Sequence, residues 1–209
     1  MSGAEGETPQ DPFQAPSQGP SYACLPRLGG AGVRLALTPP GLAPPALDWS
    51  IGPREGRLPL KDVTAVRLRF LPAKFANRAF EMEIAGRDGT RLKVGSASRI
   101  SLTGVRDQGP DYAAFVRDFH AALTASGGER SFRGGYGPLR FWVMVALGLV
   151  ALAGLLAVLG FAIAERQWNF ALFLAALGAF VVWPTVETVW RNRPVSYTPD
   201  TLPPHLLPA

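Results

Sequence analysis

The chain has 209 residues, a net charge of +5, 23 glycines, 20 prolines and one cysteine. This length accommodates one domain of about 100 residues with appendages, and the positive charge favours anionic surfaces without choosing between phospholipid and nucleic acid. The lone Cys24 excludes an internal disulfide framework and any cysteine-based zinc site. Mean hydropathy is +0.12 despite the abundant glycine and proline, because apolar residues are concentrated toward the C-terminal end.

Residues 1–28 are rich in Gly, Pro, Ser and Gln and contain almost no β-branched side chains. A segment of this composition cannot bury enough apolar surface to order itself, so it is predicted to be a disordered tail. Its first residues, MSGAEGETPQDPFQAPSQGP, have no apolar core and do not predict a signal peptide.

Residues 29–127 are predicted to form a cytoplasmic domain that begins with a sheet. Apolar and polar residues alternate with a period of two in five segments, which is typical of half-buried antiparallel strands: 33–37, 47–51, 63–70, 79–85 and 90–96. The pair Asp88-Gly89 predicts a hairpin turn between the last two.

Residues 111–126 follow these strands and repeat apolar side chains at intervals of three and four, which predicts one amphipathic helix. A curved antiparallel sheet closed by such a helix is the outline of a pleckstrin-homology-like (PH-like) barrel. The segment GRLPLKDVTAVRLRF, 56–70, resembles the strand, turn and strand of bacterial PH-like domains, which are often attached to transmembrane helices. The resemblance covers roughly residues 30–127 and implies an α+β fold with an antiparallel PH-like β-barrel. The segment 98–110 departs from the family pattern, which leaves the strand count open.

Basic side chains gather on and around the predicted strands, and the resemblance implies a headgroup or other anion site at Arg67, Arg69, Lys74 and Arg78. The alternative is a ladder of charge pairs on the solvated face, because Glu81 and Glu83 fall on the strand between these arginines and the pair Arg91 and Lys93. Nucleic-acid binding is not expected, since exposed aromatic residues do not alternate with the basic ones.

No catalytic or cofactor-binding pattern is visible. The two histidines are far apart in sequence, and one Cys with two His at these spacings assembles no metal site. The sequence therefore predicts a protein that is not an enzyme and carries no cofactor.

Residues 128–140 contain four glycines and are predicted to be a flexible tether, with Arg130, Arg133 and Arg140 placed to attract anionic lipid. Two long apolar runs follow at 141–164 and 170–190. The first is 24 residues without a charge, which makes a helix of about 36 Å and spans a bilayer core of about 30 Å. Because so few residues separate the runs, residues 141–190 are predicted to be a transmembrane hairpin.

The membrane interfaces are predicted from aromatic and basic residues near the spans: Trp142, Trp168 and Trp190, with Arg191 and Arg193 after the second span. Five arginines flank the outer ends of the hairpin, whereas Arg166 alone lies in its turn, so both termini are expected in the cytoplasm and the protein in the inner membrane. Glu187 stands four residues before Arg191, which favours an ion pair near the interface over ion handling.

Residues 191–209 form a proline-rich tail expected to dock on its own domain, on a partner, or nowhere. Together these features predict an integral membrane accessory or scaffolding protein, whose PH-like module binds an unidentified protein partner or anionic lipid at the cytoplasmic face. The alternative is a component of a transport or channel complex whose hairpin oligomerises.

Overall fold

The computed structural model describes residues 19–26, 30–39, 41, 44–71, 79–99 and 105–208. Its first sheet is an antiparallel meander of four strands in the order β1-β2-β3-β4: Ser21–Cys24, Val33–Leu37, Ala46–Ile51 and Arg54–Pro59. Apolar residues alternate along β2, so that Val33, Leu35 and Leu37 are buried while the residues between them face outward. A short 3-10 helix, η1, at Leu60–Asp62 leads into the next sheet.

The second sheet has five strands in the order β11-β10-β5-β6-β7. The long strands β5 (Val63–Leu71) and β6 (Ala79–Gly86) form its centre, and β7 (Arg91–Gly95) follows β6 through the predicted turn. Across β5 and β6 the apolar residues of one face stand opposite one another, namely Val66 with Ile84, Leu68 with Met82 and Phe70 with Phe80. The other face of these strands carries the charged residues.

One pairing in the second sheet is parallel. Strand β10, Ser131–Gly134, runs parallel to β5 and antiparallel to β11, Val195–Ser196. Strands β8 (Ala97–Arg99) and β9 (Val105–Asp107) form a separate two-stranded ribbon in the segment whose path the sequence left open. Over the described residues the strands thus divide into sheets of four, five and two, and they make no closed barrel.

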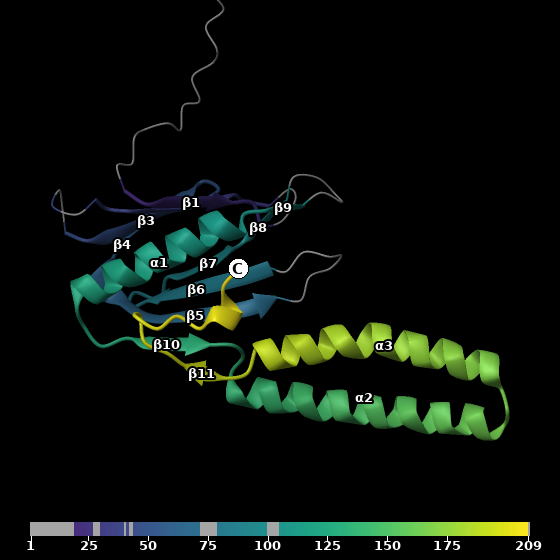
Figure 1. Ribbon diagram of the computed structural model, residues 1–209. Coiled ribbons are helices and arrows are strands. Elements are labelled where there is room, and N and C mark those ends of the chain that lie inside the picture. Colours follow the sequence, from purple (N-terminus) through teal and green to yellow (C-terminus); the bar gives the residue numbers. More distant parts are fainter. Residues whose placement is uncertain are drawn as a thin grey trace, which may run out of the picture.

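Helix α1, Gly109–Ser126, lies across the two larger sheets (Figure 1). Its apolar stripe faces inward as the periodicity predicted, and it buries Tyr112, Phe115, Val116, Phe119 and Leu123. Tyr22 on β1 stacks on Phe115 and donates a hydrogen bond to the carbonyl of Gly95 at 2.8 Å, which joins the first sheet to the end of β7. One hydrophobic core therefore lies between both sheets and α1.

The C-terminal residues complete this core. After α3 the chain forms β11 and a 3-10 helix, η2, at Pro204–Leu206, and returns to the sheet domain (Figure 1). Leu206 and Leu207 are buried among the core residues. The proline-rich tail therefore docks on its own domain, which is one of the three outcomes that the sequence left open.

Two long helices project from the sheet domain as an antiparallel hairpin, α2 at Pro138–Ala164 and α3 at Trp168–Arg191 (Figure 1). Both are long and apolar enough to cross a membrane by length and composition. Most of their large apolar side chains are exposed, and Gly178 lets α3 approach Leu155 of α2 closely. The turn is shorter than predicted, because Trp168 and Asn169 already belong to α3.

Two predicted boundaries differ from the structure. Strand β1 falls within residues 1–28, so the folded part begins by Ser21, where Tyr22 and Cys24 alternate inward into the core. Strand β10 occupies part of the segment 128–140, so the connection to α2 is a sheet strand there rather than a flexible tether.

Candidate anion site at the junction of sheet and hairpin

The hairpin is inserted between two paired strands. Strand β10 leads into α2, strand β11 follows α3, and the two pair with each other beside β5. The chain therefore enters and leaves the hairpin through neighbouring strands of one sheet, which restricts hinge motion more than a single linker does. We call the region where α2, α3 and this sheet edge meet the junction.

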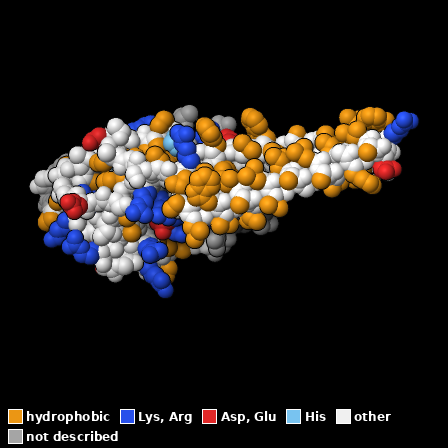
Figure 2. Space-filling view, turned by 90° about the horizontal axis from the view of Figure 1, so that it is seen from below, with side chains coloured by type: hydrophobic (Ala, Val, Ile, Leu, Met, Phe, Trp, Pro, Cys, Tyr) orange, Lys and Arg blue, Asp and Glu red, His pale blue; other side chains and the backbone are white. Residues whose placement is uncertain are grey.

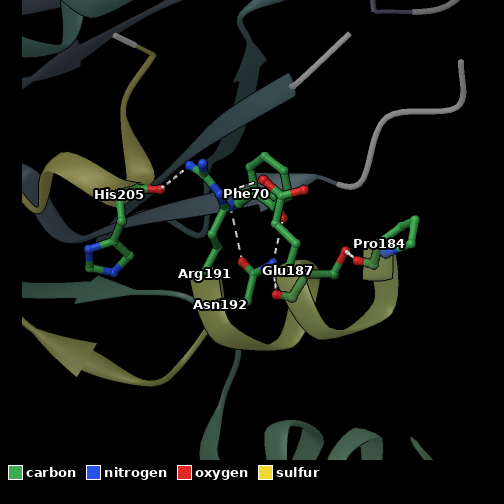
Figure 3. Close-up of polar contacts among 7 residues, drawn as sticks. Phe70, Pro184, Glu187, Arg191, Asn192 and His205 are labelled. Carbon is green, nitrogen blue, oxygen red and sulfur yellow. Dashed lines mark hydrogen bonds and ion pairs between the residues drawn. The ribbon is translucent and has the colours of Figure 1, made fainter. Parts of the chain in front are cut away.

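Asn192, which follows the last residue of α3, fastens the junction (Figure 3). Its side chain is fully buried, accepts a hydrogen bond from the Phe70 amide at 3.0 Å, and donates to the Phe70 carbonyl at 2.7 Å. It also donates to the carbonyl of Thr188 at 3.0 Å. The Asn192 carboxamide thus satisfies both backbone groups of one β5 residue, as a neighbouring strand would.

Arg191 adds a second set of contacts at the same place. Its Nε donates to Glu187 Oε1 at 3.0 Å, which confirms the predicted pair four residues apart. Its guanidinium lies 5.0 Å from the centre of the Phe70 ring and reaches the His205 carbonyl at 3.3 Å (Figure 3). Burial, with a smaller contribution from Arg193 and Arg191, lowers the pKa of His205. The guanidinium of Arg191 is therefore engaged by contacts within the protein.

The outer face of the five-stranded sheet carries part of the predicted charge ladder. Arg69 pairs with Glu83 and lies 4.0 Å from Glu81, and all three side chains are largely covered. Burial lowers the pKa of Arg69, and the nearby Glu81 opposes that change. Arg69 is thus neutralised by the strand next to it, as the ladder alternative expects.

Arg67 has a different environment. In the parallel pair of β5 and β10 it stands directly opposite Arg133. Like charges directly opposite each other on neighbouring strands are destabilising unless something compensates them. Glu83 lies across from Arg67 on its other side, but its carboxylate binds Arg69. Over the described residues neither Arg67 nor Arg133 makes a hydrogen bond or an ion pair.

These two arginines line a cavity of about 280 Å³ at the junction, which we call the junction cavity; its other lining residues are Gly134, Tyr136, Gly137, Pro138, Pro194, Val195 and Ser196. Two more arginines stand beside it on aromatic rings. Arg140 lies 4.4 Å from the centre of the Tyr136 ring, and Arg193 lies 5.3 Å from that of Trp190. Figure 2 shows Lys and Arg side chains gathered where the apolar hairpin meets the sheet domain.

The junction cavity has the chemistry of an anion site. Guanidinium groups bind phosphate or carboxylate through paired N–H donors, and the hydroxyl-bearing Ser196 and Tyr136 supply further polar groups at its wall. Over the part of the chain that the structure describes, three or more His, Cys, Asp or Glu side chains nowhere gather as a metal site would require.

The remaining predicted site residues fall in three places. Lys74 and Arg78 lie outside the described residues. Arg130, expected at the membrane interface, donates to the carbonyls of Leu123 and Leu60 at 2.8 and 2.9 Å and to Ser126 Oγ at 2.9 Å, so it fastens the end of α1 to η1. Trp142, Trp168 and Trp190 are 66%, 60% and 67% exposed, the first and last near the junction and the second at the hairpin turn.

Sequence reasoning placed Arg67 with Arg69 and grouped Arg133 with the tether, so it missed that Arg67 and Arg133 face one cavity. The alternation of Phe132 and Arg133 was the available signal for a strand there, but it extends over only four residues. Searches against family models, curated proteins and solved structures gave no match to this chain.

Proposed function

We propose that this chain is an integral protein of the cytoplasmic membrane that holds a PH-like module against the cytoplasmic face, where it acts as a non-enzymatic accessory or scaffolding subunit. In this proposal α2 and α3 span the bilayer and both termini lie in the cytoplasm. The module binds anionic lipid or a protein partner and does not bind nucleic acid.

One observation carries the proposal: an exposed apolar hairpin ends at a group of arginines that have no carboxylate partner among the described residues, namely Arg67, Arg133, Arg140 and Arg193. Basic residues close to a membrane span favour the cytoplasmic side and its anionic lipids. Trp142 and Trp190 lie at the same end of the hairpin, where an indole ring is stable at an interface.

The insertion of the hairpin between β10 and β11 supports the scaffolding part of the proposal. A module joined to the membrane through two paired strands keeps one face toward the bilayer and presents the opposite face to the cytoplasm. A partner would then meet the module in a fixed orientation, which lowers the entropic cost of assembly.

Topology is tested in intact cells with two variants of the full chain that each add one cysteine to the native Cys24, Arg166→Cys in the hairpin turn and Arg117→Cys on α1. The native Cys24 is buried, and burial raises the pKa of its thiol, so its background labelling is low. A membrane-impermeant maleimide should label Arg166→Cys in intact cells and Arg117→Cys only after permeabilisation. Labelling of Arg117→Cys in intact cells would refute the cytoplasmic orientation.

A further inference from the structure

The two helices of the hairpin flank an apolar groove of about 560 Å³ that extends from Phe141 and Arg193 at the junction to Leu155 and Leu177 farther along the hairpin. Gly148 of α2 and Gly178 of α3 line it together with mostly aliphatic side chains. A Cβ on Gly148 would meet no atom within 4 Å, so the groove is open at that point. Concave apolar surfaces of this size accommodate acyl chains or partner helices.

The groove and the junction cavity adjoin each other, because residues that line one are sequence neighbours of residues that line the other. Pro138 lines the cavity and Phe141 lines the groove, one turn apart on the same face of α2. Just after the end of α3, Arg193 lines the groove and the adjacent Pro194 lines the cavity. The apolar groove therefore ends beside the guanidinium groups that have no carboxylate partner.

We infer that this continuous surface is a binding site for one anionic phospholipid, with an acyl chain in the groove between α2 and α3 and the phosphate between Arg67 and Arg133. The inference rests on the proposed membrane insertion and identifies the lipid site of the module. The site is apolar in the groove and positively charged in the adjoining cavity. A phospholipid has the complementary arrangement, with apolar acyl chains next to a negatively charged headgroup. An uncharged partner helix would fill the apolar groove but would leave the opposed arginines without an anion.

The energetic argument favours a bound anion. The β5–β10 register holds the backbones of Arg67 and Arg133 opposite each other, so the two guanidinium groups can separate only as far as their side-chain rotamers allow. A phosphate between them converts a repulsive pair into two charge-assisted hydrogen-bonded pairs. Arg193 at the mouth of the groove and Arg140 beside Tyr136 add further positive potential.

The test measures selectivity with the full chain reconstituted in bilayers that contain trace spin-labelled phosphatidylglycerol or phosphatidylcholine, and it reads the motionally restricted fraction of each label. The wild-type chain should prefer phosphatidylglycerol. At about fivefold in affinity per arginine near anionic lipid, the double variant Arg67→Gln, Arg133→Gln should lose most of that preference. The matched control Arg117→Gln removes one arginine from the outer surface of α1, where it is exposed, and should leave the preference unchanged.

The groove is tested separately by Gly148→Leu, which places a bulky side chain in the groove at a position where the added Cβ meets no atom within 4 Å. Its control is Gly154→Leu, which also meets no atom within 4 Å of its Cβ but does not line the groove. Gly148→Leu should lower phosphatidylglycerol binding, and Gly154→Leu should not.

Three results would overturn the inference. Equal association of the two lipids with the wild-type chain would show no anionic site. Loss of preference in the arginine variant alone, with Gly148→Leu behaving as wild type, would show a headgroup contact that does not use the groove. If Gly148→Leu instead abolished cross-linking between two copies and left lipid preference intact, the groove would belong to a second chain. Failure of the chain to insert in the bilayer would refute the proposed function itself, whereas insertion without lipid preference would refute only this inference.

Discussion

Removing the side chain of Asn192 should loosen the hairpin from the sheet. In Asn192→Ala the Phe70 amide and carbonyl both lose their partner in a fully buried position. A buried polar group left unsatisfied costs about 1–3 kcal/mol, so two such groups cost on the order of 3 kcal/mol after partial relaxation. The Thr188 carbonyl still accepts a hydrogen bond from the Asn192 backbone amide at 3.1 Å, so losing its bond to the side chain adds little to this cost.

Hydrogen–deuterium exchange of the full chain in detergent micelles measures this directly at the Phe70 amide, and thermal unfolding gives the change in overall stability. Asn169→Ala is the matched control, since it removes the same side chain from an exposed position at the far end of the hairpin. A loss of about 3 kcal/mol corresponds to exchange about two orders of magnitude faster. If the Phe70 amide exchanged equally slowly in both variants, Asn192 would not fasten the junction.

Three further predictions concern the sheet domain. Arg130→Ala should lower the free energy of unfolding by about 2 kcal/mol, because the end of α1 loses its charged donor, while Arg117→Ala changes it by less than about 0.5 kcal/mol in the same chemical denaturation. Gly135→Ala should cost more than about 1 kcal/mol, because its φ of 73° is left-handed and a Cβ would overlap the Asn192 carbonyl; proteolysis of the junction reports it. His120 is buried and its Nε2 lies 3.0 Å from the Tyr197 hydroxyl, and burial lowers its pKa. Its contribution to stability is therefore complete above about pH 6.5 and falls as the pH drops toward the lowered pKa. In His120→Gln the free energy of unfolding should therefore fall less steeply as the pH is lowered below about 6.5. The same dependence of the free energy of unfolding on pH in His120→Gln and in the wild-type chain would contradict this.

The elements that the sequence predicts well are those whose pattern is local. A half-buried strand shows its period of two within a few residues, and for this reason the expected strand 63–70 agrees with β5 at Val63–Leu71. The amphipathic helix and the two apolar runs are equally local, and the structure has α1, α2 and α3 at those places. Strands β1 and β10 were missed because each has four residues in surroundings rich in glycine or proline, where alternation is too short to detect.

The site was less predictable, because its members come together through pairing that composition does not specify. Arg67 and Arg69 look equivalent in sequence, and the register sets a glutamate opposite each of them. The side chains of both glutamates nevertheless turn to Arg69, and Arg67 has Arg133 as its neighbour on the other side. Arg130 resembled a lipid-facing residue because it precedes a span, although a basic residue just past a helix end also serves as a partner for the last carbonyls. That second explanation was available from its position four residues after Ser126.

The paired strands and the proposed lipid site have a joint consequence for stability. A ligand that binds only the folded junction stabilises it in proportion to the logarithm of ligand concentration over its dissociation constant. Because Arg67 lies on β5 and Arg133 on β10, a phosphate between them strengthens the same strand pairing that carries α2. The midpoint of thermal unfolding should therefore rise as phosphatidylglycerol replaces phosphatidylcholine in the bilayer, and the rise should disappear in the variant Arg67→Gln, Arg133→Gln. An equal rise in that variant would place the effect of anionic lipid elsewhere on the chain, and the opposed arginines would then be neutralised by solvent alone.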